Sequence, residues 1–166
     1  MRSISHQASG AVVLAAGASP RYGGVKQREL VPAVLAALRE SSVDEIVVVE
    51  GAHALDLPGV RIVACPDWER GPGASLRCGL AALGDDVSRA VIVLADGPAL
   101  DPRAVDRLLV HKAPVAAASY DGARSHPVAL ARSAWGGIPD EGGRVLDPVL
   151  VDCSDLRPPG DVDVRR

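Results

Sequence analysis

Short apolar runs without polar alternation recur along the chain, and runs of this length are typical of buried strands in a parallel sheet. Each run is bounded by glycine, proline or charged residues, so it ends where a strand would end. The pattern therefore predicts a succession of short strands. Their ranges are residues 11–16, 45–50, 60–64, 90–95, 114–118, 127–130 and 149–151.

Between several of these runs, apolar residues recur at the three- and four-residue spacing of one helical face. This spacing predicts helices over residues 30–38 and 74–83, and Pro32 fits the first of them only in its first turn. Asp101 followed by Pro102 is typical of the cap and first position of a third helix. The apolar positions are Val31, Val34, Leu35 and Leu38, then Leu76, Leu80 and Leu83, then Val105, Leu108 and Leu109.

Strands that alternate with helices predict one α/β domain over residues 1–166, with three α/β/α layers and a mainly parallel, Rossmann-like sheet. Hydrophobic residues make up 48% of the chain, but aromatic residues only 2%, so alanine, valine and leucine must fill the core. Ligands of such sheets bind at the carboxyl ends of strands. Residues 17–26 follow the first predicted strand and Asp96 follows the fourth, which makes both candidates for the site.

Charge and composition narrow the classes of partner. A net charge of −3 does not favour a nucleic-acid or membrane-surface partner held by bulk charge. No apolar run has the length of about 18 residues that a membrane span requires, and residues 1–10 lack an apolar signal core, so we expect a cytoplasmic protein.

The three cysteines, an odd number without C-x-x-C spacing, predict buried free thiols rather than a disulfide framework or a zinc site.

The segment 17–26 combines glycines with two cations. Glycine lets the main chain approach a ligand closely, while Arg21 and Lys26 suit phosphate oxygens. The segment lacks the Gly-Lys-Ser/Thr ending of a P-loop, and no G-x-G-x-x-G occurs. On composition alone, an ordinary glycine loop with solvated cations remains an equal alternative.

The order of these residues, Leu14-Ala15-Ala16-Gly17 and then Ser19, Arg21, Tyr22, Gly23 and Lys26, resembles the signature of the MobA-like nucleotidyltransferases. This family includes the molybdenum cofactor cytidylyl- and guanylyltransferases. The resemblance extends over nearly the whole chain. Its further segments are Gly71 to Leu80 with Ser75, residues 94–98 around Asp96, Tyr120-Asp121-Gly122 with His126-Pro127, residues 140–144 ending at Arg144, and residues 161–163.

The resemblance implies a fold of the nucleotide-diphospho-sugar transferase type and Mg²⁺-dependent transfer of a nucleotide from an NTP to a phosphorylated precursor such as molybdopterin, with release of pyrophosphate. Residues 120–122, His126-Pro127 and 140–144 resemble the cytidylyl branch, which favours CMP over GMP. A molybdoenzyme is an expected partner. The implied roles are catalysis by Arg21, Lys26 and Asp96; nucleotide binding by Leu14, Ala15, Ala16, Gly17, Arg21, Lys26, Gly71 and Ser75; acceptor binding by Tyr120, His126 and Arg144; and Mg²⁺ binding by Asp96 and Asp163, with Asp161 as the substitute for Asp163.

The chain also departs from the family pattern. It lacks a segment that usually follows Lys26 and the usual ending after Asp163, and it has Ser125 and Gly97 where other residues are common. These departures keep three alternatives open: another acceptor such as phospholactate, a catalytically reduced nucleotide- or pterin-binding chaperone, and a redox enzyme on the same scaffold. No nicotinamide-binding motif supports the last of these.

Overall fold

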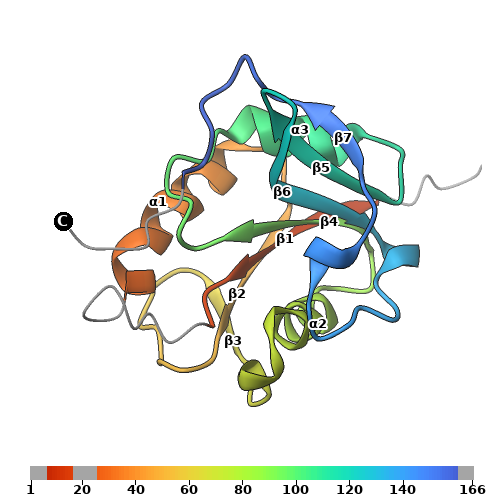
Figure 1. Ribbon diagram of the computed structural model, residues 1–166. Coiled ribbons are helices and arrows are strands. Elements are labelled where there is room, and N and C mark those ends of the chain that lie inside the picture. The colour runs from red at the N-terminus through yellow and green to blue at the C-terminus, as the bar shows by residue number, and fades with distance from the viewer. Residues whose placement is uncertain (1–6, 17–25, 161–166) are drawn as a thin grey trace, which may run out of the picture.

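Valine, alanine and leucine fill the strands of a single mixed sheet in the computed structural model, which describes residues 7–16 and 26–160 (Figure 1). Within these residues the sheet has seven strands in the order β3-β2-β1-β4-β6-β5-β7. Strand β6 is antiparallel to both of its neighbours, and the other pairs are parallel. The strands are β1 (Ala8–Leu14), β2 (Glu45–Glu50), β3 (Arg61–Ala64), β4 (Val87–Leu94), β5 (Val115–Tyr120), β6 (Ala123–Ala131) and β7 (Val149–Asp152).

Helices cover both faces of the sheet and complete the three predicted layers. Helices α1 (Lys26–Glu40) and α3 (Pro102–Val110) pack on one face, and α2 (Pro72–Ala82) packs on the other (Figure 1). Short 3₁₀ helices connect the larger elements: η1 (Trp68–Arg70), η2 (Arg132–Ala134) and η3 (Gly143–Val145). None of the described helices is long and apolar enough to cross a membrane.

Each strand and helix expected from the sequence is present, with ends that differ by a few residues, and the predicted α/β/α fold is confirmed. The N-cap of α3 is also confirmed, because the Asp101 carboxylate accepts a 2.9 Å hydrogen bond from the main-chain N–H of Arg103. The placement of Pro32 in the first turn of a helix was wrong, since α1 begins at Lys26 and contains Pro32 in its interior. Pro32 lies on the exposed side of α1, and the fully buried Val31 and Val34 hold the helix against the sheet.

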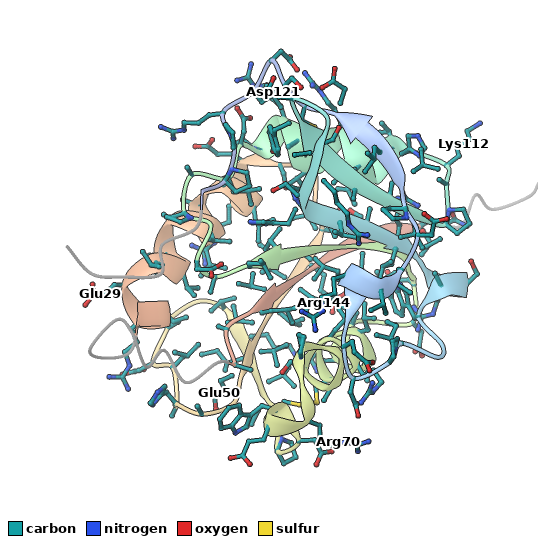
Figure 2. All side chains as sticks on the ribbon, viewed as in Figure 1. Glu29, Glu50, Arg70, Lys112, Asp121 and Arg144 are labelled. Atoms are coloured by element: carbon teal, nitrogen blue, oxygen red, sulfur yellow. A yellow bond between two sulfur atoms is a disulfide. The ribbon has the colours of Figure 1, made fainter. Side chains whose placement is uncertain are left out.

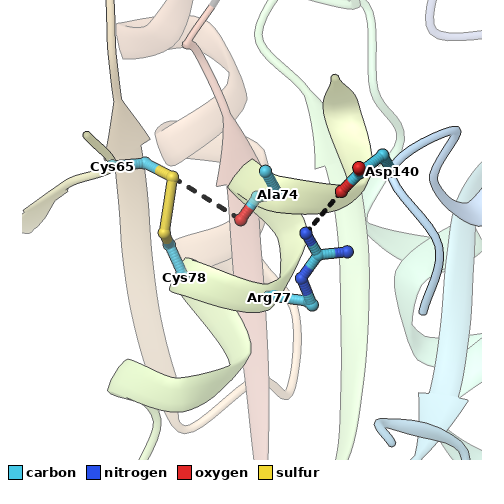
Figure 3. The surroundings of a disulfide bond; sticks show 5 residues. All are labelled: Cys65, Ala74, Arg77, Cys78 and Asp140. Atoms are coloured by element: carbon cyan, nitrogen blue, oxygen red, sulfur yellow. Dashed lines mark hydrogen bonds and ion pairs between the residues drawn. A yellow bond between two sulfur atoms is a disulfide. The ribbon is translucent and has the colours of Figure 1, made fainter. Parts of the chain in front are cut away.

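The cysteine prediction needs a correction. Cys65, which follows β3, and Cys78 of α2 form a disulfide with a Cα–Cα distance of 5.9 Å, whereas Cys153 is a buried free thiol as expected (Figure 3). The two bonded cysteines are separated by 13 positions, so no local spacing signals the pair. They meet because α2 packs across β1 and β2 and beside β3.

Candidate functional site

The carboxyl ends of β1 and β4 lie side by side, as the sequence predicts. Leu14 and Leu94 are register partners, and the main-chain N–H of Ala95 donates to the carbonyl of Leu14 at 3.1 Å. The N–H of Ala15 donates to Val49 of β2 at 3.0 Å, so the buried Ala15 and Ala16 continue the edge of the sheet. The half-buried Asp96 leaves β4 at this same edge. Gly17 and Arg21, which follow β1 in the sequence, lie outside the described residues, as does the side chain of Lys26.

The turn after Asp96 is shaped by the ring of His126 from β6. A Cβ atom at position 97 would lie 2.5 Å from Cε1 and 2.7 Å from Nε2 of His126, which is too close for a side chain. Gly97 therefore admits the imidazole against the turn that carries Asp96. This contact accounts for the glycine at position 97 of this chain.

Gly97→Ala should lower the free energy of unfolding by about 1–3 kcal/mol, because the added methyl group must displace the His126 ring or the turn. Urea denaturation measures the change. Gly136→Ala is the matched control, since no atom lies within 4 Å of a Cβ at that position. Equal midpoints for the two variants would show that the His126 contact does not restrict position 97.

A cleft of about 480 Å³ opens beside this turn, between the sheet and α2. Its wall is mostly aliphatic, and polar groups enter from β6 and from the segment around η3. Leu14 and Leu94 place it at the strand ends, directly before the predicted nucleotide loop and Asp96. The lining residues are Leu14, Pro72, Leu76, Ile92, Leu94, Arg124, Ser125, His126, Val128, Leu130, Glu141, Gly143 and Arg144.

Among the described residues that line this cleft, Arg144 is the cation that is available to a ligand. Figure 2 shows its side chain pointing from the η3 segment into the space between the central strands and α2. Among the described residues Arg144 has no carboxylate within ion-pair distance. The structure thus brings Arg144 and His126, two of the three predicted acceptor residues, to one cleft.

Tyr120, the third predicted acceptor residue, is not among the residues that line the cleft. Its side chain is 8% exposed and packs with Leu108 and Cys153 in a core cluster formed with α3. Burial raises the pKa of the phenol to about 12, and its hydroxyl has no hydrogen-bond partner in the described part of the chain. A role of Tyr120 in acceptor binding remains a prediction.

The segment 138–140 crosses the start of α2 and fixes one end of the cleft. The Asp140 carbonyl accepts a 2.9 Å hydrogen bond from the N–H of Gly73, and Arg77 donates a 2.6 Å hydrogen bond to the Ile138 carbonyl. Arg77 also donates a 2.6 Å hydrogen bond to the Asp140 carboxylate (Figure 3). The Arg77 guanidinium holds the pKa of Asp140 below its usual value, with Arg70 adding to the effect. Asp140 therefore connects α2 to the segment that carries Arg144 through these hydrogen bonds and the ion pair with Arg77.

The nucleotide-binding positions predicted on α2 have different surroundings. Gly71 is the N-cap of α2 with a φ of 132°, and a Cβ there would collide with the Asp140 carbonyl. Its glycine is thus required by close packing as well as by backbone conformation. Ser75 is buried in α2 with 3% exposure and is not among the cleft-lining residues.

The described residues supply part of the predicted metal site. No group of three or more His, Cys, Asp or Glu side chains that could hold a metal occurs among them. Asp96 is described, while Asp161 and Asp163 lie outside the described residues. The chain returns to this region at Pro159, whose carbonyl accepts a 2.9 Å hydrogen bond from the N–H of Ala99 in the turn after Asp96.

Arg124 lines the cleft but was missed by the sequence analysis. Its signal lies in the alternation along β6, where residues 124, 126, 128 and 130 all face the cleft with the period of two that a strand imposes. The predicted strand began only at residue 127, so Arg124 fell outside the pattern.

Residues 11–143 match the MobA-like NTP transferase domain, whereas no curated protein matches the chain. Rv0371c from Mycobacterium tuberculosis H37Rv is 26% identical, with a TM-score of 0.79 over 97% of this chain and 95% of that chain. Its manganese complex is 23% identical, with a TM-score of 0.69 over 88% and 89% of the two chains. A nucleotidyl transferase from Methanothermobacter, Mth528, is 22% identical, with a TM-score of 0.64 over 78% and 74%. The chain belongs to the family of MobA-like NTP transferase domains.

Proposed function

We propose that this nucleotidyltransferase moves a nucleotide, CMP more readily than GMP, from an NTP to the phosphate of a small cofactor precursor such as molybdopterin, with release of pyrophosphate. The preference for CMP rests on the resemblance of residues 120–122, His126-Pro127 and 140–144 to the cytidylyl branch. A phosphate acceptor is already anionic, so the reaction needs no general base. Positioning and stabilisation of charge then account for most of the catalysis.

The observation that carries this proposal is the cleft beside the Asp96 turn. Arg144 lines this cleft together with Leu14 and Leu94, the last residues of β1 and β4. The predicted triphosphate loop and Asp96 follow these two strand ends in the sequence. A guanidinium forms paired hydrogen bonds with phosphate oxygens, which suits an acceptor phosphate next to the reacting NTP. The apolar wall formed by Leu14 and Leu94 would exclude water from the acceptor body.

The residues at the strand ends fit a hard divalent cation. Mg²⁺ prefers one or two carboxylates together with substrate phosphate oxygens, and Asp96 supplies a carboxylate at the edge of the sheet. Asp163 is the proposed second ligand; it follows Pro159 by four residues, a length of chain that spans at most about 14 Å. The bound ion would neutralise charge that develops on the triphosphate. That Rv0371c forms a complex with manganese supports a divalent metal here.

The proposal is tested by thermal unfolding with CTP, GTP, ATP and UTP, each with and without Mg²⁺ or Mn²⁺. Ligands that bind the native state raise the midpoint by mass action, so CTP with a divalent ion should give the largest rise. Pyrophosphate release from CTP with molybdopterin then separates a transferase from a chaperone, which would be stabilised by nucleotide without turnover. No stabilisation by any NTP would refute the proposal.

Lys26→Ala should weaken CTP binding by about tenfold at low salt, because a charge-assisted contact to phosphate is lost. Lys112→Ala is the matched control, since Lys112 is the other lysine of the chain, is exposed, and lies far from the β1 end (Figure 2). Calorimetric titration with CTP measures both affinities. Equal affinities for the two variants would remove Lys26 from the nucleotide site.

A further inference from the structure

We propose that Arg124 is a positioning residue of the acceptor site, which holds η3 so that Arg144 faces the cleft. This inference rests on the proposed function, because it assumes that Arg144 receives the acceptor phosphate. Nothing in the family pattern considered above assigns a role to Arg124. The contacts of its guanidinium carry the argument.

The Arg124 guanidinium is occupied by main-chain carbonyls of the segment that bears Arg144. Nη2 donates to the Gly143 carbonyl at 2.8 Å, and Nη1 donates to the carbonyls of Leu146 at 2.8 Å and of Arg144 itself at 3.4 Å. These carbonyls belong to η3 and the residue after it. The Gly143 carbonyl also accepts a 3.0 Å hydrogen bond from the N–H of Leu146, which closes the turn. The guanidinium adds donors at the carboxyl end of this turn, where helical carbonyls commonly lack main-chain partners.

Arg124 belongs to the strand that faces the Arg144 segment, and this position explains why its contacts can set where Arg144 lies. Arg124 lies on β6, whose alternate residues form part of the cleft wall, and it is the register partner of Ser119 in β5, whereas β4 pairs with β6 over residues 128–131. The segment that bears Arg144 is thus tied to the strand that forms the facing wall of the cleft. At its other end, the same segment is tied to α2 by the Arg77 contacts to Ile138 and Asp140.

The two arginines of the cleft consequently have different tasks. The donors of Arg124 are directed at three carbonyls, whereas Arg144 points into the cleft without an ion-pair partner among the described residues. An anion in the cleft would meet the Arg144 guanidinium, and Arg124 would fix where that guanidinium stands. Small displacements of a positioned group have large effects on binding and rate, so loss of Arg124 should weaken binding of the anion by Arg144.

The test uses phenyl phosphate, a phosphate monoester with an apolar ring, titrated into the full chain by calorimetry. Arg144→Gln should weaken its binding by about 10- to 100-fold, since a charge-assisted contact is lost. Arg124→Gln should weaken it by about tenfold, and Arg124→Lys, which keeps the charge without the planar fork, should fall between Arg124→Gln and the wild type. CTP affinity should remain unchanged in all three variants.

A double-mutant cycle separates positioning from a purely structural role. If Arg124 acts through Arg144, then Arg124→Gln should have no further effect on phenyl phosphate binding in the Arg144→Gln background. Arg132→Gln is the matched control: Arg132 donates to the carbonyls of Gly84, Asp85 and Val87 at the opposite end of β4. It removes the same kind of contact away from the cleft and should leave phenyl phosphate binding unchanged.

Three results would overturn the inference: additive effects of the two substitutions, wild-type affinity in Arg124→Gln, or no binding of phenyl phosphate to the wild type. Urea denaturation of each variant confirms that the chain is folded at the titration temperature. If CTP binds while phenyl phosphate does not, the positioning inference fails and the nucleotide part of the proposed function stands. If CTP fails to bind the wild type, the proposed function fails, whereas the cycle still reports whether Arg124 positions Arg144.

Discussion

Asp96→Asn should lower the rate of pyrophosphate release from CTP by about 100-fold or more, the effect of removing one preorganised electrostatic group at a reacting centre. The substitution keeps the size and shape of the side chain but removes the negative charge that a divalent cation requires. Asp96 leaves β4 next to the β1 end, where the triphosphate is proposed to bind. Because an uncharged amide coordinates Mg²⁺ weakly, the metal concentration needed for half-maximal rate should rise together with the loss of rate.

Asp101→Asn provides the matched control for this prediction. Asp101 lies in the same loop, but its carboxylate caps α3 and pairs with Arg103 at 2.8 Å. Its replacement keeps an N-cap residue and should leave the rate of pyrophosphate release within about twofold. Equal rates in Asp96→Asn and the wild type at low Mg²⁺ would contradict the assignment of Asp96 as a metal ligand.

The sequence predicted those parts of the fold that local pattern determines. The apolar run within residues 45–50 is a strand because uninterrupted isoleucine and valine suit a sheet that is covered on both faces. The run at residues 149–151 is a strand at the end of the sheet, where Val149 and Leu150 are about half exposed and β-branched valine favours the extended backbone. The Asp101-Pro102 pair begins a helix because both residues suit its unpaired first turn. In the site, the neighbourhood of Leu14 and Asp96 followed from the rule that parallel strands end at one edge.

Contacts between distant segments could not be predicted in the same way. Asp140 fastens α2 through Arg77, which lies 63 positions away, and no local spacing distinguishes this role from ligand binding. Arg124 and the carbonyls around Arg144 are likewise brought together by the packing of η3 against β6. The prediction of free thiols at Cys65 and Cys78 was wrong for the same reason, since their contact depends on how α2 lies against β3.

Loss of the Cys65–Cys78 disulfide should lower the free energy of unfolding by about 3 kcal/mol, the loop-closure contribution expected for a crosslink of this span. The oxidised chain should contain one thiol that reacts with a thiol reagent after denaturation, because Cys153 is the free cysteine among the described residues. Cys78→Ala removes the crosslink at a half-buried position in α2, where alanine favours the helix and leaves little cavity.

The measurement is urea denaturation of the air-oxidised wild type and of Cys78→Ala, each with and without dithiothreitol. The reductant should lower the wild-type midpoint to near that of Cys78→Ala and leave the midpoint of the variant unchanged. Cys153→Ala is the matched control: it replaces a fully buried cysteine that forms no crosslink, so its smaller loss of stability should not depend on the reductant. Because α2 is fastened to β3 by the disulfide on one side and to Asp140 by Arg77 on the other, Arg77→Gln should cost more stability in the reduced than in the oxidised chain (Figure 3). Three reactive thiols in the denatured wild type, with a midpoint that does not respond to dithiothreitol, would show that the two cysteines are in contact without being bonded.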